Sequence, residues 1–299
     1  MPSSPPNNSP NPLQNPKLYI GCAVWSYKGW VGSFYPPKTQ PRDFLSLYTR
    51  KFNTVEGNTT FYAVPQAKTV TSWSERMGEG FLFCPKLPKT ITHQGLLEPK
   101  IKEADQFFQV MSDLQDNLGL VFAQLPPSYS PNYATDLEAF LSHFCDRKLA
   151  LEVRHPQWFD PENQESLDFL LRVSNITKVL LDTRPIYNCN DDPQINSQRR
   201  KPKLPLQPVV TSDSVMVRFI SHPQAELNQS YLAKWATQVK AWLEQDLTIY
   251  FFVHCPIEDY SPQTARYFLN LLEDLGVNIG RIGARDDEVA EAPTQLSLF

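Results

Sequence analysis

The sequence lacks the apolar runs of a membrane protein, because no stretch of its 299 residues reaches the ~18 apolar residues of a spanning helix. Residues 1–16, MPSSPPNNSPNPLQNP, have neither a basic start nor an apolar core, which excludes a secretory signal. No CxxC pair occurs, and the five cysteines are scattered and odd in number, so neither a disulfide framework nor a zinc knuckle is indicated. These absences favour a cytoplasmic protein with no membrane attachment.

Several catalytic and cofactor motifs are also missing. There is no Gly-rich phosphate loop, no GxSxG elbow, no kinase signature and no HxH or HExxH pair. Side chains that bind metals in other proteins are nevertheless present, and they are Glu56, His93, Glu152, Asp182 and His254. No spacing places two of them together, so a divalent metal is possible but not signalled, and the cofactor stays unknown.

Composition indicates a folded domain with polar ends. The hydrophobic content of 41% is enough for a large core. The Pro, Asn and Ser content of residues 1–16 predicts a disordered arm, residues 17–285 form the folded domain, and residues 286–299 form an extended tail. A net charge of −4 argues against a general nucleic-acid coat protein, although not against a local basic groove.

Short apolar strands alternate with helical patterns along the folded domain, which predicts parallel βαβ units. Eight strands are expected, at Leu18–Val24, Thr54–Gly57, Phe81–Cys84, Leu118–Ala123, Leu149–Val153, Lys178–Asp182, Ser214–Ile220 and Thr248–Val253. Eight such units fit a closed (β/α)8 TIM barrel. A doubly wound open sheet is the alternative, but no Gly-rich phosphate turn follows the first strand.

The pattern breaks after the sixth strand. Thr183–Pro208 is polar, rich in proline and basic at Arg199–Lys203, with no helical stripe. We therefore expect a long loop in place of the sixth helix, and loops of this length are usually functional. The prediction is a mobile flap beside the strand ends, whose basic cluster steers an anionic ligand.

Polar residues end most of the expected strands, and the active site of a TIM barrel lies at that end. Glu56 and Asn58 are two residues apart, so they face the same way in an extended chain. Candidate catalytic residues are Glu56, His93, Glu152 and Asp182. Candidate substrate-binding residues are Trp25, Tyr27, Asn58, Lys86, Gln124, Arg154, His155, Arg218 and His254.

Each candidate also has a purely structural interpretation. Glu152 and Arg154 could form a buried ion pair with a neighbour across the barrel, and such pairs serve structure as often as catalysis. The sequence does not determine whether Lys86 is exposed. Trp25 could stack on a ligand ring or merely close the barrel. The functional interpretation predicts that Glu56, Lys86, His93, Glu152, Arg154 and Asp182 share one pocket.

Five blocks of sequence together resemble the YecE-like family, also known as domain of unknown function 72. They are IGCAVWSYKGWVGSFYPP, FNTVEGNTTFYAVP, FLFCPKLPKTITH, LGLVFAQLPPS and LALEVRHPQWF. The resemblance runs from about Leu18 to Leu275 and implies a TIM barrel without an established activity. It also implies that Glu56, Asn58, Lys86, His93, Gln124, Glu152, Arg154 and Asp182 occupy family motif positions.

Two blocks depart from the family pattern. The seventh strand keeps Arg218 but continues FISHP where the family has His-Gly, and the eighth ends in His254-Cys255 in place of an Asn-rich turn.

The last five residues, QLSLF, resemble the bacterial sliding-clamp binding pentapeptide. In that interpretation the Gln295 amide anchors an extended peptide while Leu296, Leu298 and Phe299 fill apolar pockets on the clamp. The alternative is a tail that covers apolar surface of the barrel itself.

Two classes of function therefore remain open. In the first, the protein is an enzyme of the hydrolase or lyase type that acts on a phosphorylated or nucleic-acid-derived substrate. Lys86, Arg154 and Arg218 hold the anion while His93 or Glu56 transfers protons. In the second, it is a non-catalytic, clamp-associated adaptor or ligand-binding protein of DNA replication or repair. A bound anion would favour the first, and a mouth sealed by arginine would favour the second.

Overall fold

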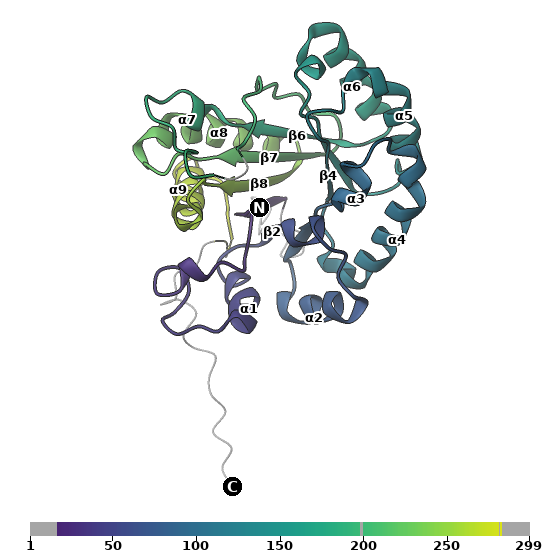
Figure 1. The fold of residues 1–299 in the computed structure, drawn as a ribbon. Helices are drawn as coiled ribbons and strands as arrows, with labels where there is room; N and C mark the ends of the chain where they lie inside the picture. Colours follow the sequence, from purple (N-terminus) through teal and green to yellow (C-terminus); the bar gives the residue numbers. More distant parts are fainter. Residues whose placement is uncertain (1–16, 198–199, 281, 283–299) are drawn as a thin grey trace, which may run out of the picture.

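The computed structural model describes residues 17–197, 200–280 and 282, and these form parallel strands wrapped by helices (Figure 1). The strands are β1 (Leu18–Cys22), β2 (Thr54–Gly57), β3 (Leu82–Pro85), β4 (Val121–Gln124), β5 (Leu149–Glu152), β6 (Thr177–Asp182), β7 (Ser214–Ile220) and β8 (Thr248–His254). The helices are α1 (Phe44–Tyr48), α2 (Ala67–Met77), α3 (Lys89–Thr92), α4 (Ile101–Met111), α5 (Ala134–His143), α6 (Pro161–Val173), α7 (Arg184–Tyr187), α8 (Glu226–Glu244) and α9 (Ser261–Asp274).

Six of these strands form one curled parallel sheet in the order β1-β8-β7-β6-β5-β4, which makes a half-barrel. The other two, β2 and β3, pair with each other in parallel. The α/β class and the parallel strands predicted from the sequence are therefore confirmed. A single closed ladder of eight strands is not formed by the described residues.

The two sheets approach each other at two edges, between β3 and β4 and between β1 and β2, and the contacts at these edges differ. β3 approaches β4 through isolated bridges, and Gly119 N donates to Phe83 O at 2.9 Å. Between β1 and β2, the described residues contain no backbone hydrogen bond. The Tyr48 hydroxyl instead accepts from Cys22 N and donates to Thr54 O. Gly21 permits this close approach, because a Cβ at that position would lie 1.9 Å from Thr54 O.

Alternation along each strand separates two layers of core. Inside the ring of strands lies a small apolar cluster of Tyr19, Cys84, Leu120, Phe122, Ala150, Val179, Met216, Tyr250 and Phe252. The larger core lies between the strands and the outer helices. A residue at a strand end therefore faces either the interior of the ring or the helix layer, and this decides whether it can join a central site.

The segment after β6 is mostly irregular, as the sequence predicts, but it begins with the short helix α7. Helix α8 is the longest of the described helices, with 19 residues, whereas α1 has only five. In the described part of the chain, no helix combines the length and apolar character needed to cross a bilayer. The cytoplasmic location stays a prediction.

Candidate functional site

A network of charged side chains fills the carboxyl end of the strand ring, which we call the mouth. Arg218 of β7 donates from Nε and Nη2 to the two carboxylate oxygens of Glu56 on β2, both at 2.8 Å. Its Nη1 donates to Glu152 of β5. Arg218 and both glutamates are at most 2% exposed at the side chain. One guanidinium thus joins strands from both sheets.

Four further residues join these three at the mouth. His254 at the end of β8 bonds through Nε2 to Glu56 at 2.9 Å, and Arg154 Nε donates to Glu152. Lys86, just after β3, donates to Gln124 Oε1 of β4 at 2.6 Å. We call the set the mouth cluster, and its members are Glu56, Lys86, Gln124, Glu152, Arg154, Arg218 and His254.

The charge states within the mouth cluster follow from burial and pairing. Burial alone would raise the pKa of each glutamate, but nearby cations outweigh it. Arg218 and His254 hold the pKa of Glu56 well below its usual range, and Arg154 and Arg218 lower the pKa of Glu152 to about 2. Burial lowers the pKa of His254 to about 3, although Glu56 opposes it. Both glutamates are therefore ionised and His254 is neutral at pH 7.

His93 lies on the loop after β3 beside the mouth cluster. Its ring packs edge to face against Phe61 at 5.0 Å between centroids, and Nδ1 bonds Thr92 Oγ1 at 2.8 Å. Partial burial is the main cause that lowers the pKa of His93 to about 4, and the charge of Arg154 lowers it further. His93 is thus a neutral imidazole on an exposed loop.

The long loop after β6 brings Lys201 to the mouth. Burial lowers the pKa of Lys201 to about 8, with further lowering by Arg218 and Arg154, whereas Glu56 and Glu258 raise it. The described residues offer its ammonium no hydrogen bond or ion pair. The loop itself is fixed nearby, since the Tyr187 hydroxyl donates to Lys201 O and Lys201 N donates to Gln194 Oε1. The predicted position of this loop beside the site is therefore correct.

Glu258, in the loop after β8, is a site residue that the sequence did not single out. Burial raises the pKa of its carboxyl group to about 7, against the lowering effect of the Ser261 hydroxyl, which donates to Oε2 at 2.7 Å. A carboxyl group with this pKa exchanges protons near neutral pH. The only sequence signal was an acidic residue soon after a strand end. Lys201 had a stronger one, because it lies in the basic run of the predicted flap.

Asp182 does not join the mouth cluster, which corrects the prediction of one shared pocket. It is fully buried on the helix-facing side of β6, where Arg184 donates to it from Nε and Nη2 and Trp235 Nε1 of α8 donates at 2.7 Å. Lys178 lies on the same face and pairs with Asp168 of α6. A catalytic role for Asp182 at the mouth is therefore wrong on geometric grounds.

We expect Asp182→Asn to lower the free energy of unfolding by about 2 kcal/mol, because charge-assisted hydrogen bonds from Arg184 and Trp235 are weakened. The same substitution should leave ligand binding at the mouth unchanged. Urea titration and a phosphate-binding assay on the same sample check both parts. A loss of binding without a loss of stability would return Asp182 to the site.

Four further candidates are held by local structure. Trp25 packs edge to face against Trp73 and Phe83 in the helix-side core, and the Tyr27 hydroxyl donates to Asp259 at 2.8 Å. Asn58 donates to Ala23 O at 2.9 Å and so ties β2 to the end of β1. His155 accepts from Gln157 N and caps a short 3-10 turn. Gln295, Leu296, Leu298 and Phe299 lie outside the described residues, so the sliding-clamp interpretation stays a prediction.

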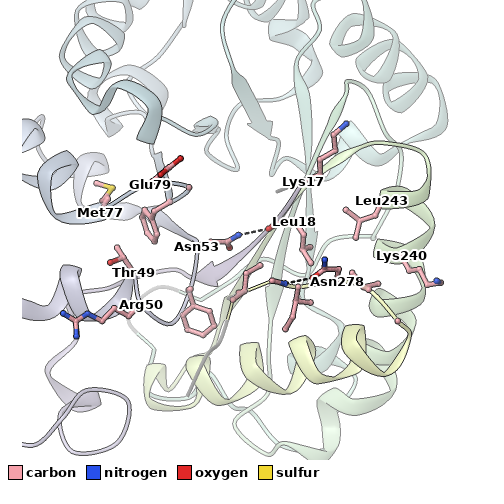
Figure 2. Close-up of a pocket in the computed structure, with 18 of the residues that line it drawn as sticks. Lys17, Leu18, Thr49, Arg50, Asn53, Met77, Glu79, Lys240, Leu243 and Asn278 are labelled. Carbon is pink, nitrogen blue, oxygen red and sulfur yellow. Dashed lines mark hydrogen bonds between the residues drawn. The ribbon is translucent and has the colours of Figure 1, made fainter. Parts of the chain in front are cut away.

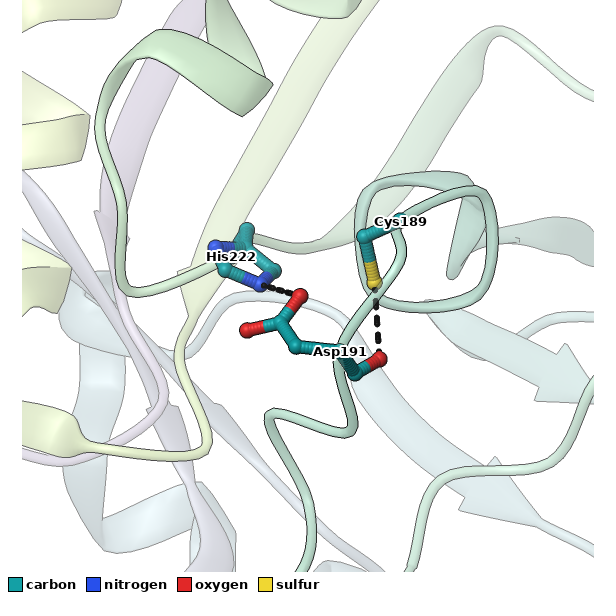
Figure 3. Close-up of side chains that lie close together, drawn as sticks. All are labelled: Cys189, Asp191 and His222. Carbon is teal, nitrogen blue, oxygen red and sulfur yellow. Dashed lines mark hydrogen bonds and ion pairs between the residues drawn. The ribbon is translucent and has the colours of Figure 1, made fainter.

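In the described residues, Cys189, Asp191 and His222 bring possible metal ligands within 4.8 Å of one another (Figure 3). His222 Nδ1 accepts from Gln224 N at 3.0 Å, so the ring proton is on Nε2, which donates to Asp191 at 3.1 Å. A metal at Nε2 would need that proton moved to Nδ1, against the Gln224 N–H. The trio therefore anchors the long loop to the end of β7 and does not fit a metal.

Two large cavities lie at the opposite end of the strands. One of about 860 Å³ lies beside the start of β1, where Lys17, Asn53, Glu79 and Lys240 surround apolar side chains such as Leu243 (Figure 2). Another, of about 810 Å³, opens beneath the strand ring. Neither contains a member of the mouth cluster. In folds built on parallel strands, ligands bind outside the carboxyl ends of the strands, so the mouth remains the candidate site.

Comparison with known proteins places the chain in a family. The model of "Protein of unknown function DUF72" matches residues 19–285, and the chain belongs to this family. It is similar to the UPF0759 protein YecE of Escherichia coli K12, with 33% identity over 94% of this chain and 100% of that protein. A shorter match to YunF of Bacillus subtilis has 29% identity over 51% of this chain and 56% of YunF.

Solved structures of the same family share the fold. A DUF72 protein of Enterococcus faecalis superposes with a TM-score of 0.67 at 16% identity and covers 86% of this chain and 95% of its own. One from Thermotoga maritima gives a TM-score of 0.64 at 21% identity, over 86% and 99%. The resemblance noted in the sequence is thus confirmed, and it names no activity.

Proposed function

We propose that the mouth is an enzyme active site that binds a small anionic, phosphorylated or nucleic-acid-derived substrate. One observation carries this proposal. The Arg154 Nη groups and the Lys201 ammonium are cationic donors for which the described residues provide no acceptor, whereas Arg218 is satisfied by two glutamates. Guanidinium Nη and ammonium groups without an acceptor suit phosphate oxygens.

Proton transfer in this proposal is assigned to Glu258 and His93. Glu258 has a pKa near 7 and can exchange a proton at neutral pH, whereas His93, with a pKa of about 4, is neutral and serves only as a weak base. Glu56, which was a candidate base, is a poor one because its pKa is strongly lowered and it accepts bonds from Arg218 and His254. Glu56 and Glu152 are better assigned to holding Arg218 in place.

We also propose that the eight strands are a variant of the (β/α)8 barrel in which side chains close one seam. The Tyr48 hydroxyl and the Asn53 amide bridge β1 and β2 in place of a ladder. In this architecture the active site lies at the carboxyl ends of the strands, which agrees with an active site at the mouth.

Lys201→Met is expected to weaken inorganic phosphate binding by about 10- to 100-fold, the loss of one charge-assisted hydrogen bond. Binding to the unmodified protein should also weaken above about pH 8, where Lys201 loses its proton. Lys201→Arg should remove that pH dependence because arginine stays protonated. Isothermal titration calorimetry measures all three proteins.

Lys203→Met is the matched control, since Lys203 is on the same loop but its ammonium lies over the Tyr187 ring at 5.7 Å. It should bind phosphate as the unmodified protein does. Turnover is tested separately with phosphoester and nucleic-acid substrates, with and without divalent metals. Equal losses in both lysine variants, or no phosphate binding at all, would contradict the anion site.

A non-catalytic ligand-binding protein is the second candidate, favoured by the sealing of Arg218 between Glu56 and Glu152. Phosphate binding without turnover of any phosphoester or nucleic-acid substrate would support it. That result would favour a non-catalytic adaptor whose mouth only binds a ligand.

A further inference from the structure

Two lysines of this protein are almost equally buried but differ in their partners. Lys178 is 6% exposed and its ammonium donates to the Asp168 carboxylate at 2.6 Å. Lys86 is 5% exposed, and the only hydrogen-bond partner of its Nζ in the described residues is the neutral Gln124 amide oxygen. Aromatic faces enclose Lys86, with the Phe61 centroid 4.1 Å and the Phe122 centroid 5.4 Å from Nζ.

These surroundings favour the neutral amine of Lys86. Burial lowers the pKa of Lys86 well below its usual range, and the charge of Arg218 lowers it further, against Glu56 and Glu152. Contact with aromatic faces favours an ammonium ion by about 0.5–2 kcal/mol, which is less than full burial of an unpaired charge costs. Lys178 differs because the Asp168 carboxylate contacts its amino group, whereas no carboxylate lies within hydrogen-bond distance of Lys86 Nζ in the described residues.

The Gln124 amide supplies the second part of the arrangement. Its oxygen accepts from Lys86, while its nitrogen is buried and has no hydrogen-bond partner among the described residues. A buried donor without an acceptor costs about 1–3 kcal/mol, so an oxygen atom of a bound molecule would satisfy it. The free N–H and the amine nitrogen belong to one hydrogen-bonded pair and can act on the same group.

We propose that Lys86 forms an imine with the carbonyl carbon of the substrate, while the Gln124 amide N–H binds the carbonyl oxygen. The amine nitrogen adds to the carbonyl carbon as the C–O π bond breaks, and the oxygen then leaves as water with both amine hydrogens. This is the chemistry of desolvated catalytic lysines. It deepens the proposed function, on which it rests for binding the charged end, by naming an anionic aldehyde or ketone as substrate.

Reductive trapping tests the imine directly. The full-length protein is incubated with glycolaldehyde phosphate and sodium cyanoborohydride, which reduces an imine to a stable secondary amine, and labelled peptides are mapped by mass spectrometry. Lys86 should be labelled at least about tenfold faster than Lys178, the equally buried control. Lys86→Arg and Lys86→Met should abolish the fast label, and Lys178→Arg should leave it unchanged. Circular dichroism confirms that each variant is folded.

Labelling with unphosphorylated glycolaldehyde tests imine formation independently of anion binding. Equal labelling of Lys86 by both aldehydes would support the imine and contradict the phosphate site. No preferential labelling of Lys86 in a protein that binds phosphate would overturn the imine and leave the anion site standing. Labelling spread over exposed lysines alone would also overturn it.

Discussion

Arg218→Met should lower the free energy of unfolding by about 3–5 kcal/mol, the usual cost of removing one partner from a buried ion pair. Methionine fills most of the volume of arginine but leaves Glu56 without its bidentate partner and Glu152 without one of its two arginines. Both carboxylates are at most 1% exposed, so water cannot replace the lost bonds. Urea denaturation monitored by tryptophan fluorescence measures the loss.

Two further variants make this result interpretable. Adding Glu56→Gln and Glu152→Gln to Arg218→Met removes the stranded charges and should recover at least half of the lost stability. Arg184→Met removes the partner of Asp182, but the Arg184 side chain is 34% exposed, so its loss should be smaller. A loss below about 1 kcal/mol for Arg218→Met would show that the network contributes little to stability.

Acidification should remove the stability that comes from keeping His254 neutral. Burial lowers the pKa of His254 from 6.5 to about 3, so the folded protein excludes a proton that the unfolded chain binds. The stability from this group is fully present above pH 6.5 and is lost as pH falls towards about 3. The loss from His254 alone should reach about 3 kcal/mol between about pH 6.5 and about pH 4.

His254→Gln isolates this contribution, because the glutamine amide can still donate to Glu56 but does not titrate. The fall in unfolding free energy between about pH 6.5 and about pH 4 should be shallower in this variant by about 3 kcal/mol. Two other groups titrate in this range: His93, whose pKa is lowered to about 4, adds a loss of the same sign, whereas Glu258, whose pKa is raised to about 7, adds stability as pH falls. Identical pH profiles for the variant and the unmodified protein would mean that His254 is not held neutral. Urea titrations at each pH provide the measurement.

Below about pH 4.5 the two glutamates add a second loss with the same sign. Their folded pKa values are lowered, to about 2 for Glu152, so stability from ionised carboxylates is present above the unfolded value and disappears as pH falls. The histidine and glutamate losses thus occupy successive pH ranges and can be separated in one titration series.

The order of strands and helices could be predicted from the sequence, because periodicity and turn residues act over a few neighbouring positions. Strand-helix alternation predicted each of the eight strands to within a few residues, and the break after the sixth strand marked the long loop. The ordered motifs from WSY to LEVRHP identified the family. Proline and capping signals placed the start of α6 at Pro161.

The membership of the site was predictable only in part. Polar residues at strand ends singled out Glu56, Glu152, Arg218 and His254, which the structure brings into direct contact. The same rule also selected Asp182. The sequence alone did not show whether the Asp182 side chain, at the end of β6, faces the interior of the strands or the helix layer. One position along a strand turns a side chain from the interior to the helix layer, and there Trp235 and Arg184 bind Asp182.

Only the tertiary structure decided how distant segments complete the mouth. Glu56 and Arg218 pair across 162 residues of sequence, and no local pattern encodes that contact. Lys201 approaches the site because its loop folds back over the strand ends, and Glu258 has a pKa near 7 because burial removes water from its carboxyl group. Local propensities determined the strands and helices of this protein, whereas long-range packing determined which charges are paired and which donors stay free.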